Sequence, residues 1–252
     1  MPTLSALLSL LLFCSSAAIA QEKGPLPQRK DSVTVSGGVT KEQLALEDRL
    51  NTILSDADQA LKARHVGDAV KRYEAALEMV RKEPLLAEQE QRVLRKAGNG
   101  YVQANRPTDA IPIFQKLLES LKKECDSETT SVSTCASAEE EFGVSKMHAG
   151  DFEGGLASLR QAEANYSKAG KLSASHEFTM IQLMDQANAR VLIAVALSRL
   201  GKTADAVITA EEAIPQLNRV KDDSDINIGI RESAASSAKN AQSILTQLKS
   251  SH

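Results

Sequence analysis

The sequence predicts an all-α fold of about four antiparallel helix pairs, followed by a final helix that caps the last pair. Of the 252 residues, 42% are apolar and 25% are charged, whereas only 3% are aromatic and tryptophan is absent. Alanine and straight-chain residues dominate instead, and these lose little conformational freedom in a helix. Four times a glycine or asparagine ends one helical stretch and a small residue opens the next. We therefore expect stacked repeats, because a helix pair that cannot bury its apolar face alone must pack on its neighbours.

The first twenty residues have the features of an export signal. Residues 4–13 are an apolar run, and the Ala-Ile-Ala sequence of residues 18–20 is a small-x-small cleavage pattern before Gln21. We predict a signal peptide over residues 1–20 and an exported protein, periplasmic or secreted. Membrane contact is expected only if this segment stays uncleaved, since no later stretch is apolar enough to span a bilayer.

Residues 21–40 predict a flexible leader, because prolines and glycines stand there among polar residues without a core-facing period. A helical repeat domain is expected from 41 to 250. Its first helix follows the apolar period that starts at Leu44, and Gly67 is expected to end this helix. The second helix then runs to about residue 82, because Pro84 cannot continue it.

The next pair is predicted as a helix over about 85–104 and a partner that ends near residue 124, joined by a turn at Asn105. A third pair turns at Gly150. The fourth pair begins with one long helix over about 173–200 and turns at Gly201. The final amphipathic helix is expected over 225–249, where it would cap the stack.

The second pair resembles a tetratricopeptide repeat (TPR), whose pattern is W-x2-L-G-x2-Y followed by A-x3-F. The residues that carry the resemblance are Leu94, Ala97, Gly98, Tyr101, Ala110 and Phe114. Leucine and alanine stand here for the tryptophan and leucine of the pattern. We expect Gly98 to let the two helices approach, Tyr101 and Phe114 to fill the space between them, and Ala110 to prevent a clash.

The resemblance extends over about residues 44–220 and implies a right-handed solenoid. The small residues that open each second helix recur at intervals of 41, 45 and 51 residues, compared with about 34 in the family, so we expect an extended-helix variant. Lys146 departs from the pattern, since the family has tyrosine there. A small all-α bundle is the alternative. The residues expected to pack the repeats are Ala69, Tyr73, Ala76, Gly98, Tyr101, Ala110, Phe114, Gly143, Gly155, Leu159, Ala162, Ala194, Ala206 and Ala213.

In the family that this chain resembles, the first helix of each pair lines a concave groove that receives a peptide or protein. Carried onto this sequence, the groove positions are Arg92, Arg95, Asn99, Val102, Gln103, Glu140 and Arg199. Arg95 and Asn99 lie one helical turn apart, an arrangement that can hold a carboxylate, whereas Glu140 opposes an acidic ligand. The alternative is that Arg92 and Arg95 are simply solvated charges.

Two cysteines, Cys125 and Cys135, lie ten residues apart around a polar stretch. In an exported protein we expect them to form a disulfide. Free thiols and metal ligands are the alternatives, although no further cysteine or histidine nearby completes a zinc set.

No catalytic pattern stands out in the chain. His176-Glu177 resembles the start of a zinc protease motif, but Met180 occupies the position of the second histidine. The net charge of -3, with both signs interspersed, gives no basic face for nucleic acid. We therefore expect a noncatalytic scaffold without a cofactor that binds a protein or peptide. The alternative is a self-associating structural module, a homo-oligomer in which the leader or a second copy fills the groove.

Overall fold

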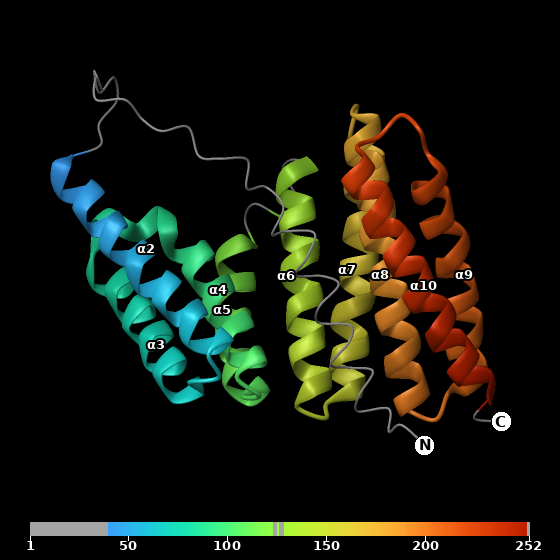
Figure 1. Cartoon of the computed structure of the whole chain (residues 1–252), viewed down its shortest axis with the longest axis horizontal. Helices are drawn as coiled ribbons and strands as arrows, with labels where there is room; N and C mark the ends of the chain where they lie inside the picture. Colours follow the sequence, from blue (N-terminus) through green and yellow to red (C-terminus); the bar gives the residue numbers. More distant parts are fainter. Residues whose placement is uncertain (1–39, 123–124, 126–128, 251–252) are drawn as a thin grey trace. The chain divides into compact units, whose positions relative to one another are not determined.

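The computed structural model describes residues 40–122, 125 and 129–250, and this part of the chain contains helices, turns and loops but no strand (Figure 1). The all-α prediction is confirmed. The described helices fall into two compact units, which we call the N-terminal unit (α2 to α5) and the C-terminal unit (α6 to α10). The predicted signal peptide and all but the last residue of the predicted leader lie outside the described residues. One repeat domain from 41 to 250 stays a prediction.

In the N-terminal unit, each helix packs on the next one in sequence, and the first helices of its two pairs, α2 and α4, also touch. Its elements are α2 (Lys41–Lys62), α3 (Val66–Lys82), the 3-10 helix η1 (Pro84–Gln89), α4 (Glu90–Gln103) and α5 (Pro107–Leu121). The Thr40 hydroxyl accepts a hydrogen bond from the Gln43 amide at 3.1 Å and begins α2. Two predicted boundaries were wrong. The stretch from residue 85 starts as a 3-10 turn rather than as one continuous helix, and α5 ends at Leu121 rather than near 124.

In the C-terminal unit the helices also pack in order, and α8 contacts both α6 and α10. The elements are α6 (Thr129–His148), α7 (Phe152–Leu172), α8 (His176–Arg199), α9 (Thr203–Asp222) and α10 (Ile228–Ser250). Side chains set two of the helix starts. The Asp151 carboxylate accepts from the Gly154 amide at 2.8 Å, and the Ser175 hydroxyl accepts from the Phe178 amide at 3.3 Å. The cap at Ser175 makes α8 shorter than the predicted helix over 173–200.

The four turns inside the helix pairs are alike. In each turn, one residue has a positive φ and lies two positions after the last residue of the first helix. The small residue that packs the second helix follows five positions later. These residues are Arg64 (φ 60°), Asn105 (φ 58°), Gly150 (φ 89°) and Gly201 (φ 75°). The expectation that Gly67 ends the first helix was therefore wrong: Gly67 lies in the first turn of α3, and Arg64 takes the left-handed position.

The same backbone hydrogen bonds close all four turns. After each left-handed residue, the next amide donates to a carbonyl five residues earlier, as from Arg106 to Tyr101 and from Lys202 to Leu197, both at 2.9 Å. This Schellman hydrogen bond gives a partner to a carbonyl group near the helix end that would otherwise have none within the helix. The chain therefore reverses in the same way in every pair.

Close contacts in the second pair depend on glycine. A Cβ atom added to Gly98 would lie 2.7 Å from Cζ of Phe114, and one added to Gly100 would collide with the ring of Tyr73. Phe114 is fully buried, and Tyr101 is 5% exposed. Gly98 therefore lets α4 approach α5, whereas Gly100 lets α4 approach α3 of the preceding pair.

The third pair is closest where two glycines face each other. A Cβ atom on Gly155 of α7 would lie 2.9 Å from the carbonyl oxygen of Gly143 on α6, and one on Gly143 would lie 2.9 Å from Cγ of Leu159. The small residues expected to pack the other helices have no exposed surface: Ala69, Ala76, Ala110, Ala162, Ala194, Ala206 and Ala213.

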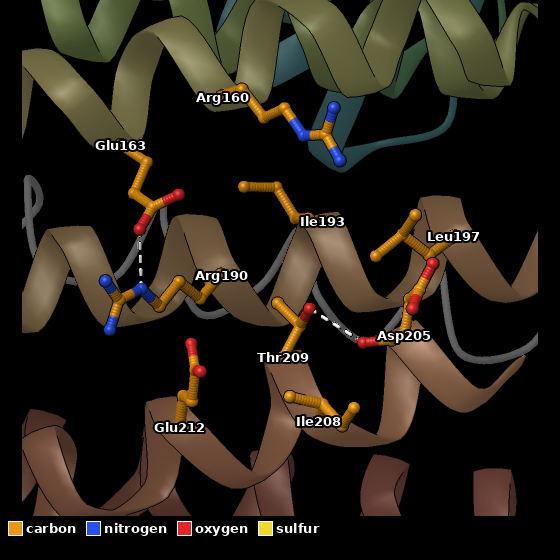
Figure 2. A pocket seen from close by; sticks show the side chains of 9 residues that line it. All are labelled: Arg160, Glu163, Arg190, Ile193, Leu197, Asp205, Ile208, Thr209 and Glu212. Carbon is orange, nitrogen blue, oxygen red and sulfur yellow. Dashed lines mark hydrogen bonds and ion pairs between the residues drawn. The ribbon is translucent and has the colours of Figure 1, made fainter. Parts of the chain in front are cut away.

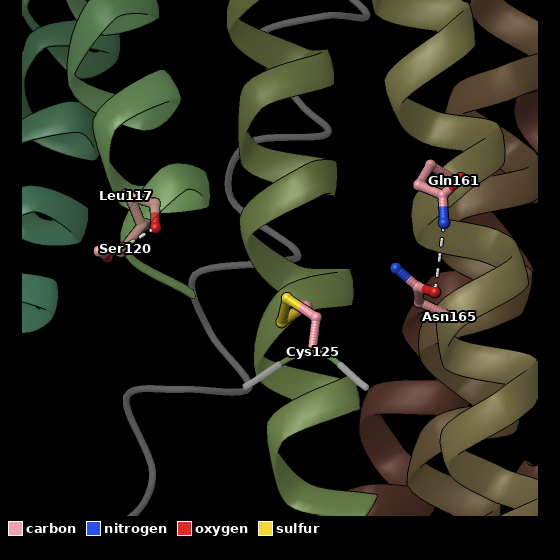
Figure 3. The surroundings of a disulfide bond; sticks show 6 residues. Leu117, Ser120, Cys125, Gln161 and Asn165 are labelled. Carbon is pink, nitrogen blue, oxygen red and sulfur yellow. Dashed lines mark hydrogen bonds between the residues drawn. A yellow bond between two sulfur atoms is a disulfide. The ribbon is translucent and has the colours of Figure 1, made fainter. Parts of the chain in front are cut away.

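The two cysteines lie at disulfide distance in the C-terminal unit, with their Cα atoms 5.7 Å apart (Figure 3). Cys125 precedes α6, and Cys135 lies within α6 and is 1% exposed. A bond between them would fasten the segment that enters α6 to the helix itself. Formation of this bond and export of the protein both stay predictions.

Candidate partner-binding surface

The first helices of successive pairs lie beside each other within each unit, and their polar side chains decide what a partner could meet there. In the N-terminal unit, Arg92 of α4 reaches across to α2. Its Nη2 donates to Oδ1 of Asn51 at 2.9 Å, and its Nε donates to Oε1 of Gln89 at 2.9 Å. Arg92 is exposed, but its guanidinium already joins two helices.

The other predicted groove positions on α4 differ in exposure. Arg95 and Asn99 are partly buried, and each already makes an interaction within the chain. Val102 is 7% exposed and belongs to the core, whereas Gln103 is exposed. Of the predicted groove positions on α4, Gln103 and Arg92 are therefore the most accessible to a partner.

Asp58 of α2, whose side chain is 37% exposed, joins three helices. Its Oδ1 accepts the hydroxyl of Tyr73 on α3 at 2.7 Å, and its Oδ2 lies 2.5 Å from Nζ of Lys96 on α4. Burial, followed by the hydrogen bond to Asp58, raises the pKa of Tyr73 well above its usual value of 10. Asp58 therefore fixes how α3 and α4 sit against α2.

A second tyrosine, Tyr101, links α4 to α3. Its hydroxyl donates to Oε1 of Glu74 at 3.3 Å, and the guanidinium of Arg106 lies 5.3 Å from the centre of its ring. Burial, followed by the charge of Glu74, raises the pKa of Tyr101 to about 12. Tyr101 therefore fills the space between helices with its ring, as the repeat pattern predicts, and its hydroxyl has a polar partner in Glu74.

In the C-terminal unit, Glu140 of α6 lies against the second helix of its own pair. It is 8% exposed and is hydrogen-bonded to Tyr166 of α7, which is 5% exposed. The expectation that Glu140 lines an open groove and opposes an acidic ligand therefore does not fit its position. A buried carboxylate needs such a partner, and the tyrosine hydroxyl supplies it.

Tyr166 lies among small residues and acids. Ala136, Ala162 and Ala189 pack with its ring, while Glu140, Asp185 and Glu141 surround its hydroxyl with negative charge. Burial is the main reason that the pKa of Tyr166 lies far above 10, and the three carboxylates raise it further. Burial also raises the pKa of Asp185, on α8, from 3.8 to about 7.

Lys146 and Arg199, the two other residues of this unit named in the sequence analysis, each lie over an aromatic ring. Nζ of Lys146 is 3.9 Å from the ring centre of Phe142 and 3.3 Å from Oγ of Ser158, so it occupies the site of the family's tyrosine with a cation-π contact. The guanidinium of Arg199 lies 4.8 Å from the ring centre of Phe152. Arg199 is exposed at the end of α8.

Neither a metal site nor a membrane span accompanies this surface in the described part of the chain. Within residues 40–122, 125 and 129–250, no cluster of three or more His, Cys, Asp or Glu side chains is arranged to hold a metal ion. No helix over the same ranges has both the length and the apolarity to cross a membrane.

Sequence reasoning missed the junction at Asp58 and the buried carboxyl of Asp185. The partners of Asp58 lie 15 and 38 residues away, a separation that no local pattern reveals. Asp185 did leave a signal, because it is the only acid between Glu177 and the end of a helix that is otherwise mostly apolar.

Comparison with known proteins supports the fold. No family model and no curated protein matches the chain. Two crystal structures of TPR-like repeats from a putative kinesin light chain of Podosopora anserina, one of them a point variant, align with a TM-score of 0.52 each. They are 15% and 14% identical to this chain; each alignment covers 80% of this chain and 93% or 94% of the other.

These findings define the class of protein. The chain has a TPR-like helical repeat fold, as the resemblance in its second pair predicted. The longer helices of the C-terminal unit agree with the predicted extended-helix variant, since α6 to α9 have 20 to 24 residues, compared with 14 and 15 in α4 and α5. The fold is typical of protein-interaction scaffolds.

Proposed function

We propose that this protein is a noncatalytic scaffold of the cell envelope or the secreted space, and that a protein or peptide binds along its first helices. The observation that carries the proposal is that first helices lie side by side within each unit: α2 with α4 in the N-terminal unit, and α6 with α8 in the C-terminal unit, where the final helix α10 also contacts α8. We call each of these surfaces a first-helix row. Stacked helix pairs of this kind form extended surfaces for other chains. The proposed site in the N-terminal unit centres on the exposed Gln103, with Arg92 and the partly buried Arg95 on the same helix.

The chemistry of this site favours a polar segment of the partner over a purely apolar one. Arg92, Arg95, Asn99 and Gln103 offer amide and guanidinium groups, whereas Val102 is buried beneath them. Guanidinium groups bind carboxylates through paired, charge-assisted hydrogen bonds. A segment with carboxylate side chains is therefore the proposed ligand class for this unit.

Export and the disulfide belong to the same proposal. The apolar run and the cleavage pattern at residues 18–20 support removal of the first twenty residues. The disulfide distance between Cys125 and Cys135 fits an oxidising compartment. The exported protein should begin at Gln21 and contain no reactive thiol, which intact-mass measurement with a thiol-reactive label checks directly.

Affinity capture tests the binding site. The tagged full chain is compared with Arg95→Glu and Gln103→Glu in recovery of partners from envelope extract. Lys71→Glu on α3 is the matched control, because Lys71 is exposed on a second helix and the substitution changes charge by the same amount as Arg95→Glu. We expect the two α4 variants to lose a partner that wild type and Lys71→Glu retain. Equal recovery by all four proteins would contradict the proposed site.

A further inference from the structure

A pocket of about 290 Å³ opens in the C-terminal unit on the side of the second helices, α7 and α9, with α8 as its floor (Figure 2). We call it the α7–α9 pocket. Ile193 and Leu197 of α8 form the floor, and each is 3% exposed. Ile208 of α9 stands at the rim and is 54% exposed. Apolar surface therefore continues from the buried floor to an accessible isoleucine.

The α7 side of this pocket carries one acidic and one basic side chain. Glu163 of α7 is engaged, since its Oε1 lies 2.5 Å from Nε of Arg190 on α8. Arg160, one turn earlier on α7, is exposed, and among the described residues it makes no hydrogen bond or ion pair. In Figure 2 its guanidinium extends over the floor and away from Glu163.

The α9 side has the opposite charge. Asp205 and Glu212 line it, and no basic residue of α9 does so. The second arginine of the lining, Arg190, is already bonded to Glu163. Thr209 lies between the two acids, and its hydroxyl donates to the backbone carbonyl of Asp205 at 2.8 Å. An apolar floor thus separates the Arg160 guanidinium on α7 from two carboxylates on α9.

We propose that the α7–α9 pocket is a second binding site, separate from the first-helix row, and that it takes a peptide segment of a partner protein. The segment carries an aliphatic side chain on Ile193 and Leu197, an acidic residue against Arg160, and a basic residue against Asp205 and Glu212. The apolar contact supplies affinity, and the two flanking charges set the direction of the segment.

Selection from a displayed library of random heptapeptides on the purified full chain tests this assignment even though the partner is unidentified. We expect enrichment of peptides in which an aliphatic residue stands between an acidic and a basic one. A selected peptide, synthesised with both ends blocked, is then titrated against the variants. Arg160→Glu should weaken its binding about tenfold or more, the effect of losing a charge-assisted contact. Lys171→Glu, the same charge change on α7 outside the pocket, should leave it unchanged.

Charge reversal provides the stronger test. A peptide whose acidic residue is replaced by lysine should bind Arg160→Glu better than it binds wild type, because the attraction is restored with both signs exchanged. Gln103→Glu should not change the binding of either peptide. The outcome for the α7–α9 pocket can therefore be told apart from the outcome for the first-helix site.

Three results would overturn the proposal: no enriched charge pattern, enriched peptides that bind Arg160→Glu as well as wild type, or self-association of the chain that Ile208→Ser abolishes. The last result would assign the surface to contact between copies.

Discussion

Substitution of Gly155 by alanine tests the packing of the helix pairs most sharply. The new Cβ atom would lie 2.9 Å from the carbonyl oxygen of Gly143 and 2.5 Å from Cγ of Met147. The Met147 side chain is only 2% exposed and has little room to move. The Gly143 carbonyl belongs to the backbone of α6 and cannot move unless the helix does. Gly155→Ala must therefore push α6 and α7 apart.

The magnitude follows from two opposing effects. Overpacking of a core costs about 1 to 3 kcal/mol, and contact with backbone puts this site near the upper end. Replacing glycine by alanine inside a helix gains about 1 kcal/mol. The expected net loss is therefore about 2 kcal/mol. For a unit of this size roughly 4 °C corresponds to 1 kcal/mol, so the unfolding temperature should fall by about 8 °C.

Thermal unfolding followed by far-UV circular dichroism measures the effect, and the same helix offers a matched control. A Cβ atom on Gly170 would meet its nearest neighbour, Cβ of Gln182, at 3.4 Å, an ordinary contact. Gly170→Ala should therefore raise the unfolding temperature or leave it unchanged. If Gly155→Ala unfolds at or above the wild-type temperature, the close approach of α6 and α7 is wrong.

Three further predictions concern polar groups. The folded pKa of Asp185, about 7, exceeds its usual 3.8, so the folded state binds more protons and stability should fall as the pH rises from about 4 to about 7; Asp185→Asn should flatten this fall in pH-dependent melts. Tyr73→Phe removes the hydrogen bond to Asp58 and should cost about 1 kcal/mol in urea unfolding; no loss would contradict that contact. Reduction of the protein should free the thiols of Cys125 and Cys135, and reaction of both residues with a thiol label before reduction would contradict the disulfide.

The helix pairs could be predicted because their packing rules are local in sequence. Gly98, Ala110 and Phe114 alternate small and large side chains as two crossing helices require, and the structure places the Gly98 backbone against the Phe114 ring. The recurrence of such residues at four places was enough to indicate a stack. The register of each second helix followed from its small residue.

The first turn could not be predicted by the same reasoning. Glycine adopts positive φ at no steric cost, so Gly67 was the natural choice for a helix end. The structure uses Arg64 instead, since the Schellman hydrogen bonds and the packing of Ala69 fix the turn five residues before that alanine. The energy of the whole turn outweighs the preference of one residue.

Which polar side chains reach a partner was also beyond the sequence. The family pattern places Glu140 on a groove, but longer helices and an additional tyrosine, Tyr166, give its carboxylate a buried partner on α7. Arg92 likewise finds Asn51, 41 residues earlier in the chain. Such contacts depend on the three-dimensional packing of helices that are distant in sequence.

Site-specific photo-cross-linking in the producing cell tests the proposed scaffold role most directly. A photoreactive residue replaces Gln103 on the first-helix row or, in a second strain, Lys71 on α3. We expect position 103 to form a cross-linked product with another protein and position 71 to form none. Cross-links of equal yield at both positions, or a product from position 103 that contains only two copies of this chain, would contradict the scaffold role.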